Sequence, residues 1–174
     1  MTSLPRLFSF EGRARRFEWW LTCIAVSLLA GLIVAVAALA ISGGDASILG
    51  RDAPKPAAVL VLNLIAGAVV IWIQAAVGVR RVHDRGQSGA GLILYQVIGY
   101  AMNAAPVVLH LTGGASPYIP FGGFMMGGLM VVYVLWSLYF LITLGFLEGE
   151  PTANAYGRSP KTVQTSTYAA PALD

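Results

Sequence analysis

The sequence predicts an all-α integral membrane protein with four transmembrane helices in a bundle and both termini in the cytoplasm. Apolar residues make up 57% of the 174 residues and charged residues 11%, whereas soluble domains carry about 25% charged residues. The mean hydropathy is +0.72, and the apolar residues are gathered into long runs. Because a backbone in lipid must satisfy its own hydrogen bonds, such runs predict helices. The composition argues against a water-soluble enzyme and against a disordered chain.

Four apolar runs are each long enough to cross about 30 Å of hydrocarbon, which takes about 20 helical residues. They comprise residues 19–41, 57–79, 91–111 and 121–147. The first run contains no charge, and the fourth is uncharged and rich in aromatic residues. The third is the weakest, because polar side chains and Pro106 interrupt it. We expect one membrane-spanning helix from each run.

Four amide side chains lie within the second and third runs: Asn63, Gln74, Gln96 and Asn103. Amides in hydrocarbon are often functional, but they also simply join helices, at about 1 kcal/mol or less. No Asp, Glu, Lys or Arg lies within any of the four runs. Since proton relays normally use such residues, this pattern argues against a proton-coupled transporter.

The basic residues predict the orientation. Nine Lys and Arg residues lie before the first run, between the second and third, or after the fourth, against two, Arg51 and Lys55, in the remaining connections. By the positive-inside rule, the nine lie in the cytoplasm. We therefore divide the chain into a cytoplasmic basic and aromatic segment (1–18), a four-span membrane domain (19–147), a cytoplasmic turn motif (148–161) and a tail expected to be disordered (162–174).

Three polar segments on the predicted cytoplasmic face are the candidates for a site. The first, residues 10–20, reads FEGRARRFEWW. If it is helical, Arg13, Arg16 and Trp20 fall on one face. Trp19 and Trp20 stand where the first span begins, the level at which indoles favour the headgroup region. A basic, aromatic anchor accounts for this composition, although it does not require Gly12.

The second segment, residues 80–89, reads RRVHDRGQSG. Its adjacent His83 and Asp84 do not make a metal site, which needs three or four ligands, and the other histidine, His110, is predicted near the opposite face. Adjacent residues also rarely orient one another as a catalytic triad demands. We expect Asp84 to pair with an arginine and His83 to cap or to hydrogen-bond the backbone. We expect no catalytic, cofactor-binding or metal-binding residue.

The third segment, residues 149–160, reads GEPTANAYGRSP. Asn154, Gly157 and the two prolines are typical of a compact series of turns. Glu148 and Glu150 can neutralise arginines of the other two segments. The sequence thus favours a salt-bridged cytoplasmic cap.

Together the three segments resemble the domain of unknown function 805 family of small bacterial inner-membrane proteins. The family patterns are F-x-G-R-x-x-R-x-x-[FYW]-W, R-R-x-H-D-x-G-x-S-G-W and G-x-x-x-x-N-x-[YF]-G-x-x-P, and they occur here in order across residues 10–160. The chain departs from them at Ala90, in place of tryptophan, and at Arg158-Ser159, in place of Pro-Asp. The resemblance implies a multi-pass protein of the bacterial inner (plasma) membrane and brings no established activity. The candidate residues for lipid or partner contact are Gly12, Arg13, Arg16, Trp19, Trp20, Arg80, Arg81, His83, Asp84, Gly86, Ser88, Gly89, Asn154, Tyr156, Gly157 and Pro160.

Three functions are compatible with this pattern. The leading hypothesis is a non-enzymatic membrane module whose cytoplasmic basic layer contacts anionic lipid headgroups or a partner protein, each basic residue near an anionic surface contributing about 1 kcal/mol. The alternative is a small transporter or channel, assembled from several copies around the four amides because one bundle leaves little room for a pore. The third, an enzyme, would have to use His83, Asp84 and Ser88. We expect no cofactor and no nucleic-acid partner.

Overall fold

The computed structural model describes residues 4–50, 55–113 and 123–160, and these residues are helical apart from loops and one isolated bridge between Asn154 and Gly157. The elements in chain order are α1 (Leu4–Phe8), α2 (Arg16–Ile41), the 3-10 turn η1 (Ala46–Leu49), α3 (Ala57–His83), α4 (Ala90–Leu111) and α5 (Gly123–Gly145). The expected disordered tail and residues 121–122 of the fourth run lie outside the described residues. The all-helical prediction is confirmed for the part of the chain that the structure describes.

Four of the described helices are long and apolar enough to cross a membrane: α2, α3, α4 and residues Gly128–Gly145 of α5. The protein is therefore a multi-pass membrane protein, as predicted. Several helix ends differ from those of the apolar runs, and two of them differ by three or more residues. Helix α3 continues past residue 79 to His83, and α2 begins at Arg16. Residues 10–20 are not one helix, because Gly12 has a φ of +86° and Arg13 precedes the first turn of α2, so the shared helical face considered for Arg13, Arg16 and Trp20 does not form.

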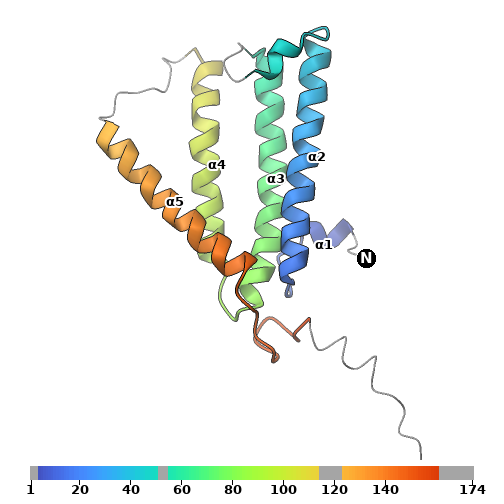
Figure 1. Ribbon diagram of the computed structural model, residues 1–174, viewed down its shortest axis with the longest axis vertical. Coiled ribbons are helices and arrows are strands. Elements are labelled where there is room, and N and C mark those ends of the chain that lie inside the picture. Colours follow the sequence, from blue (N-terminus) through green and yellow to red (C-terminus); the bar gives the residue numbers. More distant parts are fainter. Residues whose placement is uncertain (1–3, 51–54, 114–122, 161–174) are drawn as a thin grey trace, which may run out of the picture.

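The four long helices do not run side by side throughout. Helices α2, α3 and α4 stand next to one another, whereas α5 crosses diagonally, meets the others near its C-terminal end and diverges from α4 toward its N-terminal end (Figure 1). The predicted four-helix bundle is therefore not confirmed. Hydropathy indicates which segments enter the membrane, but it carries no information about how far along their length two spans stay in contact.

The core sits where α5 meets the other helices. A cluster of buried side chains joins α3, α4 and α5 there: Val79, Val82, Leu92, Phe140 and Leu144. Phe10 and Trp19 pack against it. Most other large apolar side chains of the long helices are exposed, as expected where lipid is the solvent. Glycines permit the close packing: a Cβ at Gly78 would stand 2.5 Å from the Leu92 side chain.

Candidate functional site

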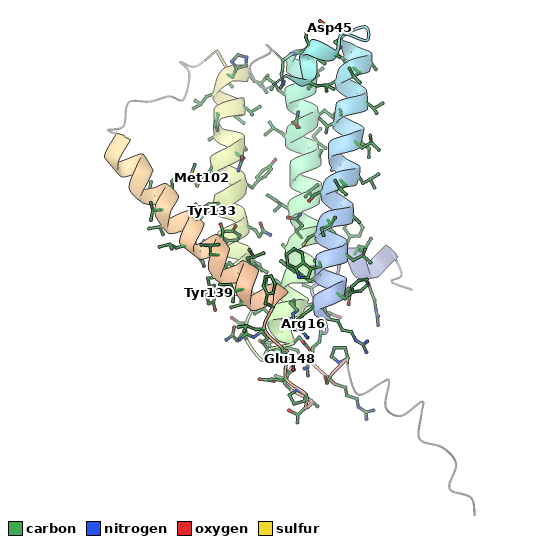
Figure 2. The ribbon with its side chains drawn as sticks, viewed as in Figure 1. Arg16, Asp45, Met102, Tyr133, Tyr139 and Glu148 are labelled. Atoms are coloured by element: carbon green, nitrogen blue, oxygen red, sulfur yellow. The ribbon has the colours of Figure 1, made fainter. Side chains whose placement is uncertain are left out.

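The three polar segments converge at the end of the helices where the core lies. We call this region, made of residues 10–20, 80–89 and 145–160, the polar end. Figure 2 shows Arg16 of α2 and Glu148, which follows α5, at this end, and Asp45 at the opposite one. Helix α3 contributes to the polar end through its last turn, which carries Arg80, Arg81 and His83.

Arg13 is the centre of the polar end, and its side chain is only 1% exposed. Its Nε donates to the Asp84 carboxylate at 2.9 Å, and its Nη2 donates to the Asp84 carbonyl at 3.2 Å and to the Glu150 carbonyl. Its Nη1 donates to the carbonyls of Thr152, at 2.7 Å, and Gly157, at 3.3 Å. A guanidinium has five N–H groups, so every donor of Arg13 is used. One side chain from the first segment therefore binds both of the others.

Asp84 lies between two buried arginines. Its second carboxylate oxygen accepts from Nη1 of Arg81, whose side chain is also 1% exposed. The Arg81 Nε donates to the carbonyl of Leu144 at 3.0 Å, and its Nη2 donates to the carbonyl of Leu147. The last carbonyls of a helix lack intrahelical partners and carry partial negative charge. Arg81 thus caps the end of α5 and fixes it to the last turn of α3.

Arg80 makes a separate link between α2 and α3. Its Nη1 donates to the Glu18 carboxylate at 3.0 Å, and the side chains are 4% and 26% exposed. Its main-chain carbonyl accepts from the Ala14 N–H at 3.1 Å. The Arg80 Nη2 is buried without a hydrogen-bond partner among the described residues. The link extends the attachment of the N-terminal segment along the last turn of α3.

Arg16 and Trp20 hold the first turns of α2 against the end of α5. The Trp20 Nε1 donates to the Gly145 carbonyl at 3.2 Å. Arg16 donates to the Phe146 carbonyl at 2.9 Å and to the Glu148 carboxylate at 3.1 Å. The Arg16 side chain is 42% exposed, so this contact lies at the surface, unlike those of Arg13 and Arg81.

The segment after α5 folds into a turn beneath His83. The Asn154 amide donates to the His83 carbonyl at 3.0 Å and to the Glu150 carboxylate at 2.9 Å, and its oxygen accepts from the Tyr156 N–H at 3.0 Å. The rings of His83 and Tyr156 stack with centroids 3.7 Å apart and an interplanar angle of 5°. Gly157 closes the turn through paired main-chain hydrogen bonds to Asn154 at 3.0 and 3.1 Å.

Two glycines let the backbones of these segments touch. The Gly149 position leaves no room for a Cβ, which would overlap the Asp84 carboxylate and stand 2.9 Å from the Asp84 carbonyl. Gly86 has a φ of +69°, and a Cβ there would lie 2.5 Å from the Glu150 carboxylate. Both contacts lie between residues that follow α3 and residues that follow α5.

Comparison with known proteins identifies the family of the chain. Residues 7–158 match the family model described as "Protein of unknown function (DUF805)". The chain belongs to the DUF805 family. The search of curated proteins found no match, and neither did the search of solved structures. The matched stretch contains all of the candidate residues predicted from the sequence except Pro160.

The structure brings most of the DUF805 pattern residues into one network. The remaining members have smaller roles. Gly89 packs tightly on Val79 of α3, Ser88 is exposed, and the Pro160 carbonyl accepts a hydrogen bond from Arg15. The expected pairing of Glu148 with an arginine is present.

Glu150 takes a different part from the one expected in the salt-bridged cap. Its carbonyl accepts from Arg13, while its carboxylate accepts from Asn154 and is not joined to an arginine among the described residues. The expected pairing of Asp84 with an arginine is present twice over.

Arg15, Glu18 and Arg85 also belong to the polar end and were not among the residues predicted from the sequence, and Arg15 donates to the Pro160 carbonyl. Glu18, the ion-pair partner of Arg80, is the acidic residue in the first turn of α2. Its position beside an uncharged run was the available signal, because a carboxylate there needs a partner. Arg85 donates to the Thr143 carbonyl at 3.3 Å. Because every residue has a main-chain carbonyl, the residue type of the partner does not reveal such a contact.

The polar end is arranged to hold segments together. Its central charges are paired or bonded to carbonyls, and they are buried. In the described part of the chain no group of three or more His, Cys, Asp or Glu side chains is placed to hold a metal ion. In this arrangement the three DUF805 motifs bind one another and join the ends of α2, α3 and α5.

Proposed function

We propose that this protein is a non-enzymatic module of the bacterial inner membrane, with both termini in the cytoplasm and a polar end that contacts anionic lipid headgroups. The observation that carries the proposal is that some arginines of the polar end are buried whereas others are exposed. Arg13, Arg80 and Arg81 are buried and bonded within the chain. Arg158 is exposed at the same end, and Arg16 keeps 42% of its side chain exposed although it is bonded to Phe146 and Glu148, so both can meet charges outside the chain.

The orientation is supported by the distribution of charge. The described N-terminal segment, the α3–α4 connection and residues 146–160 after α5 lie at one end of the helices (Figure 1). The eight described basic residues of the predicted cytoplasmic side belong to these parts of the chain or to the adjoining turns of α2 and α3, whereas Lys55 belongs to the α2–α3 connection at the other end. Such an asymmetry is typical of cytoplasmic loops.

The surface available for headgroups contains Arg16, 42% exposed at its side chain, and the exposed Arg158. Each basic residue near an anionic surface contributes about 1 kcal/mol. Trp19 and Trp20 are at the start of α2, and indole rings favour the headgroup level. The role of the buried arginines is then to hold this surface in place.

Native mass spectrometry of the protein released gently from its membrane tests the lipid contact. The variant Arg16→Gln/Arg158→Gln is expected to retain less phosphatidylglycerol than the wild type. Arg51→Gln/Lys55→Gln, which removes the same charge from the connection between α2 and α3, is expected to retain as much as the wild type. Equal retention by both variants would contradict the proposal, and a protein recovered with the wild type but not with the first variant would assign the surface to a protein partner.

Labelling with a membrane-impermeant thiol reagent tests the orientation separately. Ser88 and Ser47 are exposed at opposite ends of the helices. In intact cells Ser47→Cys is expected to react, and Ser88→Cys is expected to react only after the membrane is permeabilised. The reverse pattern would overturn the proposed topology.

A further inference from the structure

Three cavities among the membrane-spanning helices meet at one side chain, Gln96 of α4. The largest, about 660 Å³, lies between α3 and α4 with Tyr133 of α5 at its side, and all four amides of the second and third runs line it. A second, about 410 Å³, lies under the crossing of α5 and is lined by Gln74, Tyr95 and Gln96 among others. A third, about 560 Å³, lies along α3 and α4 and shares Gln96 and Tyr100 with the first.

Helix α5 borders the first and second cavities without filling them. Tyr133 lies on the α4 side of α5 (Figure 2), and its hydroxyl occupies the space that a Cβ at Gly99 would need. The Tyr95 and Tyr133 rings stack with centroids 4.9 Å apart. Beyond this contact α5 diverges from α4 (Figure 1). The cavities are thus formed within one chain.

Gln96 differs from the other three amides, each of which donates a hydrogen bond within the protein. Asn63 and Asn103 donate to carbonyls of their own helices at 3.1 and 2.7 Å, and Gln74 donates to the Ser27 hydroxyl at 3.0 Å. Within the described ranges, Gln96 has no hydrogen-bond partner. It stands about 9 Å along α4 from Ala90, at 1.5 Å per residue, where an unpaired amide facing hydrocarbon is costly.

The third cavity is lined mainly by apolar side chains, unlike the largest one, which the four amides line. Apart from Gln96 and Tyr100, its lining side chains are apolar, and Phe10 and Trp72 meet there edge to face with ring centroids 5.3 Å apart. A polar cavity and an apolar one therefore join at Gln96. This junction suits a molecule that has a hydrogen-bonding group at one end and a hydrocarbon chain at the other.

We propose that these joined cavities bind an uncharged amphiphile, with a hydroxyl or carbonyl group hydrogen-bonded to Gln96 and an apolar chain lying along α3 and α4 toward Phe10. The ligand is uncharged because the charged side chain at these cavities, Lys55, lies at the far mouth of the largest one and already donates to the Ile48 and Gly50 carbonyls at 2.8 and 2.9 Å. An ion in the middle would lack a counter-charge in a medium of low dielectric constant. A volume of several hundred Å³ is in the range of small-molecule sites.

Photo-crosslinking in lipid nanodiscs tests the site with a defined probe, a diacylglycerol that carries a diazirine in one acyl chain. We expect the label on the peptides that contain Ile71, Trp72 and Val97, which line the apolar cavity. Unlabelled dioleoylglycerol is expected to compete and phosphatidylglycerol to compete poorly. Gln96→Met, which keeps the length of the side chain, is expected to lower site labelling about fivefold, the effect of one lost hydrogen bond.

Leu94→Met provides the matched control, because Leu94 is exposed on the same helix and lines none of the three cavities. Its labelling is expected to equal that of the wild type. Three results would each overturn the proposal: label spread evenly over exposed residues of α2 such as Leu28 and Leu32, equal competition by phosphatidylglycerol, or unchanged labelling of folded Gln96→Met. The wild-type labelling map decides the question even if Gln96→Met does not fold.

Discussion

Arg13 and Asp84, 71 positions apart in the chain, are joined twice, once through the Asp84 carboxylate at 2.9 Å and once through its main-chain carbonyl at 3.2 Å. The pair is almost completely buried, with 1% and 6% of the side chains exposed. Removing one partner of a buried ion pair leaves an uncompensated charge, which is far more costly than the loss of a surface pair. The stability of the polar end should therefore depend on this pair more than on its exposed ones.

Replacing Arg13 should destabilise the protein strongly. Arg13→Gln leaves Asp84 with one arginine and removes donors from three carbonyls outside Asp84, and we expect a loss of about 3–5 kcal/mol. Arg13→Lys should not rescue it, since an ammonium cannot reproduce the planar arrangement of five donors. Unfolding in detergent measures the effect. Arg16→Gln, at the exposed pair, is the control and should cost about 1 kcal/mol or less; an equal loss in both variants would contradict a central role for Arg13.

Adding one methyl group at Gly149 should separate the α3–α4 connection from the segment after α5. Gly149→Ala places a Cβ in the position of the Asp84 carboxylate, and overpacking of this kind costs about 1–3 kcal/mol or more. Gly31→Ala is the matched control, because a Cβ there meets nothing within 4 Å in the middle of α2. Alanine favours a helix over glycine by about 1 kcal/mol, so the control should be neutral or stabilising in a thermal unfolding assay. A harmless Gly149→Ala would show that the two backbones are not in contact.

The ion pair between Arg80 and Glu18 should show coupling in a double-mutant cycle. Glu18→Gln and Arg80→Gln each leave one charge without its partner, whereas the double variant removes both charges. The double variant should therefore be more stable than the sum of the single effects predicts, by about 0.5–3 kcal/mol. Free energies of unfolding for the four proteins give this coupling directly. Strict additivity would mean that the two side chains act independently.

The stacked rings of His83 and Tyr156 should hold the terminal turn. Tyr156→Ala removes the stack, and aromatic pairs contribute about 0.5–1.5 kcal/mol beyond the area they bury. We expect faster hydrogen exchange of main-chain amides in residues 150–157, with little change within α2 and α4. Tyr156→Phe keeps the ring and should exchange like the wild type. Faster exchange in Tyr156→Phe as well would attribute the effect to the hydroxyl rather than to the stack.

The four spans were predictable from the sequence because lipid selects apolar runs of a fixed length. The three polar segments were also recognisable, since Gly, Asn and Arg at particular spacings stand out between apolar runs. Their charges favoured a cap that joins them, but most of the contacts that form it were not predictable from residue types alone. Arg13 finds most of its partners among main-chain carbonyls, such as those of Glu150 and Thr152, and any residue supplies a carbonyl.

The divergence of α5 was unpredictable for a related reason. Its apolar residues satisfy the membrane equally well whether they face lipid or another helix, so hydropathy does not distinguish the two. Likewise, the amides Gln74 and Gln96 were recognised as unusual, but only the packing of α3 against α4 brings them to a common cavity. Sequence patterns indicated which residues matter; three-dimensional packing determined which of them meet.

The hydrogen bonds of Arg13 can be completed only late in the synthesis of the chain. Arg13 leaves the ribosome early, Asp84 follows after two spans, and Glu150, Thr152 and Gly157 emerge only after the last span. Until then three of the five donors of Arg13 have no carbonyl to bind. A nascent chain that stops short of residue 157 therefore carries an incompletely bonded guanidinium at the membrane surface, which distinguishes it chemically from the finished protein.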